Sequence, residues 1–345
     1  MYIVNKIKSV KFIYLIIMKK KFSDQIIIDG LQYCNWNREL FEDVWRGGLT
    51  AIHVTLVYWE NTEESFEKIK EWNLCFEENK DIICHAKSTN DILEAKKNNK
   101  VAILFGFQNS APIANDIYLV ESFFKKGLRF MQLTYNNQTP LAGGCFEPKD
   151  SGVSRFGKAV IEEMNRLGMI VDLSHAGKQT CLDAIHHSSS PVAISHANPS
   201  FFHKALRNID NDVLIELAKK NGFIGLSLYP YHLKNLGQCT IEDYCSMVKQ
   251  LINLIGIEHI GIGSDLCKNW PDEVVMWMRN GKWTKKIDYG ESTSKDTAWP
   301  QQPSWFTKGS DLQNIFESLV LNGLTDDQVF KILGENWLRF MKNHF

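Results

Sequence analysis

The chain has 345 residues, 44% of them hydrophobic and 23% charged, with a formal net charge of -1. This composition is typical of a globular protein that is long enough for one large core. The near-zero charge gives no electrostatic reason to expect nucleic acid or an anionic membrane as a partner. The eight cysteines form no CxxC pair, which favours reduced thiols in a cytoplasmic protein over a disulfide framework or a zinc ribbon.

The N-terminal segment, residues 1–24, is predicted to be a leader or a disordered stretch outside the fold. Its apolar patch at residues 12–18 is far shorter than the roughly 20 residues of a membrane span, and no small-residue cleavage site follows. A second methionine, Met18, stands just before the first apolar run. We therefore expect residues 1–17 to be a non-structural leader or the product of a misplaced start, with a secretory signal as the weaker alternative.

Apolar runs of strand length recur along the rest of the chain and alternate with segments of helical periodicity. The eight runs are 25–29, 51–57, 101–107, 128–135, 169–175, 191–196, 223–229 and 259–265. Most are continuously apolar, as strands covered on both faces require. Eight strands alternating with helices favour a single α/β domain over residues 25–345, a (β/α)8 TIM barrel. A doubly wound open sheet is the alternative, but no glycine-rich phosphate loop follows the first run.

Capping residues mark several helices between these runs. Gly168 follows one helical segment and Thr240 opens another, as helix ends require. Residues 268–308 show neither helical nor strand periodicity and contain five tryptophans. A segment of that length without regular elements is often functional, so we expect an irregular tryptophan-rich lid over the C-terminal mouth of the barrel. Helices at about 309–322 and 325–342 are predicted to close the chain.

Polar side chains stand at the ends of several predicted strands, where a barrel gathers its active site. His175 ends the fifth run, His196 the sixth and Asp265 the eighth, while Gln108 and Tyr135 end the third and fourth. Neutral imidazoles are ligands that zinc prefers, and a carboxylate can act on the water that the metal activates. These residues predict a divalent-metal site, with a hydrogen-bonded structural role as the alternative for either histidine.

The other histidines are weaker candidates for metal ligands. His53 lies within the second run, away from the expected mouth. His85, His203 and His232 fall in expected loops and have no ligand partner at a suitable spacing. The metal prediction therefore depends on the two strand-end histidines.

Three stretches carry a resemblance to a known family. They are "SRFGKAVIEEMNRLGMIVDLSHAG", "PVAISHANPSFFHKALRNIDNDVL" and "GIEHIGIGSDL". On these residues the chain resembles the membrane (renal) dipeptidase family of zinc metallopeptidases, within the amidohydrolase-type barrels. The resemblance covers nearly the whole chain from about residue 25. It implies a binuclear zinc centre that hydrolyses small dipeptides, in a protein that pairs as a homodimer.

The resemblance also implies roles for individual residues. His175 and His196 match the two histidines of the second metal, and Asp265 matches the aspartate that handles the proton of the bridging water. Arg207 matches an arginine that is implied to hold the substrate carboxylate. A planar guanidinium suits that role, because it can donate two parallel hydrogen bonds.

The chain departs from the family pattern at the first metal. Leu31 and Tyr33 stand where the family has His and Asp, and Gln108 stands where it has the bridging Glu. Tyr135 replaces a substrate-polarising His. The departures are mutually consistent, because a site without the first metal's ligands no longer requires a bridging carboxylate. They predict one zinc ion rather than two.

Three hypotheses follow for function. The first is a mononuclear zinc hydrolase of a dipeptide or N-substituted amino acid, with Asp265 as general base, Arg207 as anchor, and Tyr135 and Gln108 orienting the scissile carbonyl. The second is a catalytically altered or inactive barrel that binds a small zwitterionic, amino-acid-like ligand. The third and weakest is a binuclear dipeptidase with a replacement ligand from Cys34 or the lid.

Overall fold

The computed structural model describes residues 21, 22, 24–281 and 300–345. Its strands are β1 (Ile28–Gln32), β2 (Ala51–Val57), β3 (Ile83–His85), β4 (Val101–Phe107), β5 (Leu128–Gln132), β6 (Ile170–Asp172), β7 (Ala193–Ala197), β8 (Phe223–Leu226) and β9 (Ile260–Ile262). Its longer helices are α2 (Arg38–Arg46), α3 (Thr62–Glu78), α4 (Thr89–Lys97), α5 (Tyr118–Lys125), α6 (Arg155–Leu167), α7 (Lys178–His187), α8 (Asn211–Lys219), α9 (Ile241–Ile255), α10 (Asp272–Asn280) and α11 (Leu312–Leu321). The short helices α12 (Asp326–Phe330) and α13 (Asn336–Met341) flank a π-helical turn at Lys331–Glu335.

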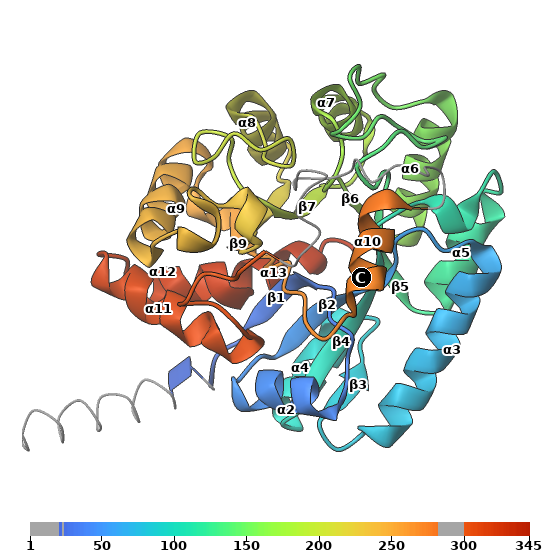
Figure 1. The fold of residues 1–345 in the computed structure, drawn as a ribbon. Helices are drawn as coiled ribbons and strands as arrows, with labels where there is room; N and C mark the ends of the chain where they lie inside the picture. Colours follow the sequence, from blue (N-terminus) through green and yellow to red (C-terminus); the bar gives the residue numbers. More distant parts are fainter. Residues whose placement is uncertain (1–20, 23, 282–299) are drawn as a thin grey trace, which may run out of the picture.

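Eight parallel strands close into a barrel. The ring runs β1, β2, β4, β5, β6, β7, β8 and β9, and β9 pairs with β1 to complete it. The helices surround this ring (Figure 1). The prediction of a (β/α)8 TIM barrel is confirmed, and each predicted run overlaps one barrel strand. The ninth strand, β3, pairs with the first three residues of β4 and was not predicted.

Local capping explains where the helices begin and end. Ser154 accepts a hydrogen bond from the Gly157 backbone N–H at the start of α6, and Gly168 adopts φ +79° directly after it. Thr240 accepts from the Asp243 N–H at the start of α9. These side chains satisfy N–H groups that the first helical turn leaves without an intrahelical acceptor. The left-handed conformation at Gly168 avoids the steric cost that a Cβ would add.

The barrel is filled and closed at the end opposite its mouth by α13. An inner cluster of buried residues comes from the early parts of the strands and from α13: Ile28, Ala51, Ala102, Leu104, Phe130, Ile170, Ala193, Phe223, Trp337, Phe340 and Met341. The Trp337 indole N–H donates to the Ile262 carbonyl at 2.7 Å. A Cβ on Gly30 would lie 2.3 Å from the Trp337 ring, so this glycine makes room for the indole.

Truncating this indole is expected to destabilise the barrel strongly. The Trp337→Ala variant should lose about 3–5 kcal/mol of unfolding free energy, because it leaves a cavity and an unpaired Ile262 carbonyl. Trp337→Phe should lose less, since it keeps most of the packing. Urea denaturation of the three proteins measures both losses. Equal stability of wild type and Trp337→Ala would contradict the closing role of α13.

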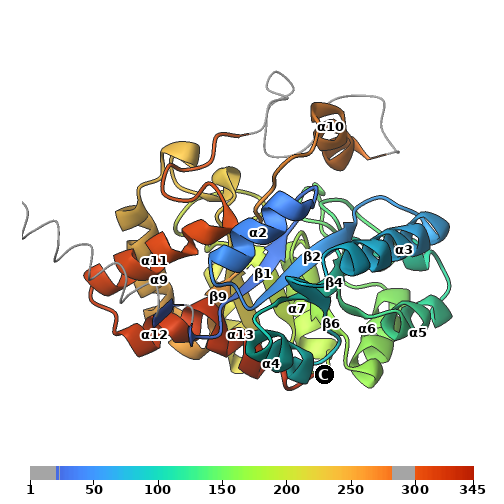
Figure 2. The same cartoon turned by 90° about the horizontal axis from the view of Figure 1, so that it is seen from below.

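The predicted lid is only partly irregular. Residues 272–280 form helix α10, in which Val275 and Met278 are buried, so the expectation of no regular element is wrong there. Figure 2 shows α10 set apart from the ring of helices, on the side away from the chain's C-terminus. Residues 282–299 of the predicted lid, and most of the predicted leader at 1–24, lie outside the described residues.

The N-terminal residues that are described pack onto the barrel's helices. Phe22 is buried and its ring packs edge-on against Phe316 of α11, with the ring centroids 6.1 Å apart. Within residues 21–22, 24–281 and 300–345, no helix has the length and apolar character needed to cross a membrane.

Candidate metal centre

Two predicted histidines face each other at the barrel mouth. His175 follows β6 and His196 lies in β7, and their Nε2 atoms are 3.0 Å apart. The Oε1 atom of Gln108, which follows β4, is also 3.0 Å from His175 Nε2. The structure therefore brings together three residues that lie far apart in the sequence.

The hydrogen bonds behind these rings determine where their protons lie. His175 Nδ1 contacts Asn136 Oδ1 at 2.6 Å, and an amide oxygen can only accept, so Nδ1 carries the proton. His196 Nδ1 contacts Ser195 Oγ at 2.8 Å, while that hydroxyl donates to Asp172 at 2.5 Å. Ser195 Oγ therefore accepts from His196 Nδ1. In both rings the facing Nε2 atom is left with a lone pair.

Gln108 adds a third acceptor to the same point. Its Nε2 donates to Thr55 Oγ1 at 2.8 Å, which turns its Oε1 toward His175. Two imidazole nitrogens and an amide oxygen thus converge without a proton between them. Lone pairs that face one another repel, so this arrangement suits a divalent cation with nitrogen and oxygen ligands. The residues present therefore fit one metal ion.

Burial keeps both imidazoles in the neutral form that binds a metal. Burial lowers the pKa of His175 and of His196 well below the usual 6.5, and the positive charge of Arg207 adds to the effect in each case. Neither ring has to lose a proton before it binds a cation at neutral pH.

Three side chains of the site stand on backbone in the left-handed region. The φ angles are +63° at Asn136, +66° at His175 and +57° at Asp265. The Asp265 N–H donates to the Leu31 carbonyl at 2.9 Å, and the His175 carbonyl accepts from Cys145 at the same distance. Such conformations are costly for residues with a Cβ and concentrate at functional sites. The strand ends therefore bend sharply where the site residues project.

Leu31 and Tyr33, which the resemblance matches to ligands of the family's first metal, lie in a mainly apolar cluster. Leu31 and Tyr33 are buried with Tyr58, Tyr135, Cys267 and Met278. The Tyr58 ring packs edge-on against the rings of Tyr33 and Tyr135, with centroid distances of 6.2 and 5.9 Å. In the described part of the chain, no group of three or more His, Cys, Asp or Glu side chains is arranged to hold a metal. The imidazole pair and Gln108 are thus the metal-compatible set.

A small cavity of about 50 Å³ opens beside the imidazole pair. It is lined by Tyr33, Gln108, Tyr135, Asn136, His175, Arg207, Tyr229, His232, Asp265 and Arg279. Besides His175, four predicted side chains line the cavity: Gln108, Tyr135, Arg207 and Asp265. Arg207 is 2% exposed and donates to the His196 carbonyl at 3.0 Å, so its guanidinium is held against the metal-compatible set.

Sequence reasoning missed several residues of this cavity, among them a histidine and an arginine. His232 follows β8, and its Nδ1 lies 2.8 Å from Ser227 Oγ. Arg279 comes from α10 and makes a side-chain hydrogen bond with Tyr229. His232 stands shortly after the seventh predicted run, and that position was the available signal. Arg279 has no local sequence signal, since it lies in a segment that was predicted to be an irregular lid.

Solved structures and curated sequences resemble this chain. An amidohydrolase from Pseudomonas aeruginosa is 33% identical, with a TM-score of 0.88 over 94% of this chain and 98% of that one. An uncharacterized dipeptidase of Schizosaccharomyces pombe is 33% identical over 51% of this chain and 44% of its own. A dipeptidase of Claviceps purpurea is 25% identical over 83% of this chain and 61% of its own. The chain thus spans about half the length of the curated relatives that it matches.

A sequence profile covers most of the barrel. The profile of membrane dipeptidases matches residues 34–274, which include both strand-end histidines, Arg207 and Asp265. The match begins after Leu31 and Tyr33, the two substituted positions of the first strand. Together with the fold and the imidazole pair, it shows that the chain belongs to the membrane dipeptidase family of peptidases.

Proposed function

We propose that this protein hydrolyses the amide bond of a dipeptide or small amino-acid derivative at a site that holds one zinc ion. The observation that supports the proposal is the convergence of two unprotonated Nε2 atoms, of His175 and His196, at 3.0 Å. Gln108 Oε1 would be the third protein ligand. When bound, zinc would supply Lewis-acid polarisation of the carbonyl and activation of water near neutral pH.

The chain's own residues would bind the substrate and move its protons. Asp265 is the carboxylate of the cavity and would accept the proton of the attacking water. Tyr135, whose ring centroid lies 4.4 Å from that of His175, would donate to the scissile carbonyl. Gln108 is better suited to a ligand role than to the predicted orienting role, because its N–H group donates to Thr55.

Two guanidinium groups make the cavity suitable for an amino-acid-like substrate. Arg207 and Arg279 both line it, and each can bind a carboxylate through two parallel hydrogen bonds. The small volume of the cavity, about 50 Å³, argues against a long peptide as the substrate. A homodimer, a cytoplasmic location and the absence of a nucleic-acid partner stay predictions.

Metal titration tests the proposal directly. Protein purified without chelator should contain about one zinc ion per chain and should hydrolyse members of a dipeptide panel. Chelation should abolish hydrolysis, and about one equivalent of zinc should restore it, with no further gain from a second.

A requirement for about two zinc ions would contradict the mononuclear site. Protein that binds no metal and hydrolyses nothing, but binds a zwitterionic amino acid in calorimetry, would establish the binding-protein alternative instead.

A further inference from the structure

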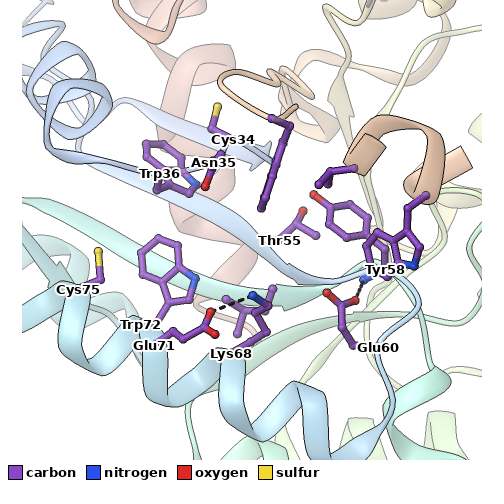
Figure 3. A pocket seen from close by; sticks show the side chains of 14 residues that line it. Cys34, Asn35, Trp36, Thr55, Tyr58, Glu60, Lys68, Glu71, Trp72 and Cys75 are labelled. Atoms are coloured by element: carbon purple, nitrogen blue, oxygen red, sulfur yellow. Dashed lines mark hydrogen bonds and ion pairs between the residues drawn. The ribbon is translucent and has the colours of Figure 1, made fainter. Parts of the chain in front are cut away.

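A second cavity lies beside α10, apart from the imidazole pair. Its volume is about 340 Å³, and it is lined by the chain after β1, the end of β2, helix α3 and the segment entering α10 (Figure 3). It shares no described lining residue with the small cavity beside the imidazole pair, which is called the central cavity below. Tyr58 stands between the two, because its ring packs against Tyr33 and Tyr135 of the central cavity. An occupant would therefore be distinct from a substrate bound at the histidines.

Five aromatic side chains line this second cavity: Trp36, Tyr58, Trp72, Trp270 and Trp277. They are held by contacts outside the cavity. The Trp36 ring stacks on Phe41 with centroids 5.1 Å apart, and the Trp270 N–H donates to the Tyr33 carbonyl at 2.7 Å. Rings that are fixed in this way leave a cavity instead of collapsing onto one another. Their π faces carry partial negative charge, which attracts cations.

Glu60 adds a buried carboxyl group to the wall. Its carboxylate is 9% exposed, and its Oε2 accepts the backbone N–H groups of Tyr58 and Trp59 at 2.7 and 3.1 Å. Among residues 21–22, 24–281 and 300–345 it forms no ion pair, whereas Glu71 of the same cavity is neutralised by Lys68 at 2.8 Å. Burial raises the pKa of Glu60, although its hydrogen bonds to backbone N–H groups and the positive charge of Lys68 on the same wall oppose the shift. A bound cation would favour the ionised carboxylate.

A polar group on a second part of the wall has no hydrogen-bond partner among the described residues. The Trp36 indole N–H is buried and finds no acceptor among the described residues. In Figure 3, Trp36 and Glu60 stand on different sides of the cavity, with Thr55 between them. The cavity thus offers a carboxylate at one side, aromatic faces along its wall and a hydrogen-bond donor at another. The single unneutralised carboxylate among aromatic rings does not suit a metal ion, which requires several oxygen or nitrogen ligands.

We propose that this second cavity binds an organic ammonium ion carried on an apolar body. The ammonium group would pair with Glu60, and the apolar body would lie against the aromatic wall formed by Trp36, Trp72 and Trp277. A hydrogen-bond acceptor on the same molecule would satisfy the Trp36 N–H. The inference does not depend on the proposed hydrolysis, because no residue of the imidazole pair contributes to this cavity.

Calorimetry with a matched pair of probes tests the inference. Phenethylammonium carries the charge, and 2-phenylethanol has a similar shape without it. We expect the ammonium probe to bind roughly tenfold more tightly than the alcohol. Glu60→Gln should remove this preference, whereas Glu63→Gln, an exposed position early in α3, should keep it. Trp72→Leu should weaken the ammonium probe roughly two- to fivefold, because it removes one aromatic face.

The His175→Ala variant separates this inference from the proposed function. Binding of phenethylammonium should be unchanged in it, even though the metal site is lost. Equal affinity for the two probes, a preference that survives Glu60→Gln, or binding that disappears with His175→Ala would each overturn the proposal. Because Glu60 also holds two backbone N–H groups, thermal melting of Glu60→Gln must show a folded protein, and Trp72→Leu provides the independent variant if it does not.

Discussion

The His175→Ala variant is expected to lose zinc binding and hydrolysis together. Its imidazole is one of the two nitrogen ligands, and its Nε2 contacts both His196 and Gln108 at 3.0 Å. Changes that only disturb the partners of a ligand cost about 10–100-fold in metal affinity, so removal of the ligand itself should cost more than about 100-fold. Metal analysis after dialysis against a competing chelator, followed by an assay of hydrolysis, measures both losses.

Two further variants provide an intermediate loss of zinc affinity and a control for this experiment. Asn136→Ala removes the acceptor that fixes the His175 ring and should weaken zinc by about 10–100-fold without abolishing binding. His186→Ala is the matched control, because His186 is an exposed residue of α7 that contacts Glu216 on the surface. Zinc content that is unaffected by His175→Ala, or that falls equally in His186→Ala, would show that the imidazole pair is not the metal site.

The Asp265→Asn variant is expected to retain zinc and lose hydrolysis. A general base contributes about 10²–10⁴-fold to rate, so kcat should fall by a factor in this range while KM changes little. Asparagine is the appropriate replacement, because position 265 has φ +57° and asparagine tolerates this conformation. Steady-state kinetics on a dipeptide, with zinc content determined on the same samples, measures the effect.

The control for this variant is Asp272→Asn. Asp272 is an exposed carboxylate in the first turn of α10, and its neutralisation removes a charge near the mouth without changing the cavity. Its kcat should stay within about twofold of wild type, as is usual for a surface position. Undiminished activity in Asp265→Asn would show that another group accepts the proton.

Most of the fold was predictable because the pattern and periodicity of apolar residues are local properties of the sequence. The barrel strands are covered on both faces, so each appears as a continuous apolar run, and all eight were found. The strand β3 was missed because only Ile83 of its three residues is fully buried, so Ile83–His85 does not appear as a continuous apolar run. Helix α10 was missed because only Val275 and Met278 are buried in its nine residues, which gives no clear helical stripe.

The candidate site was predictable where strand ends determine position. His175, His196 and Asp265 follow three of the predicted runs, and parallel strands in a barrel bring such residues to one mouth. His232 and Arg279 were not predictable in the same way. Their places in the cavity depend on a short turn after β8 and on how α10 packs over the barrel.

By itself, the sequence determined the barrel and the residue types at the strand ends. Only the tertiary structure decided what those residues do. Asp29 ends an apolar run as a catalytic residue would, yet it is fully buried and accepts hydrogen bonds from the Ser264 N–H and hydroxyl at 2.7 and 2.5 Å, joining β1 to the chain after β9. Conversely, Gln108 and His175 form an acceptor cluster because Thr55 and Asn136 accept hydrogen bonds from Gln108 Nε2 and His175 Nδ1. Such partners come from separate strands, so the direction of each hydrogen bond is a long-range property that no local pattern encodes.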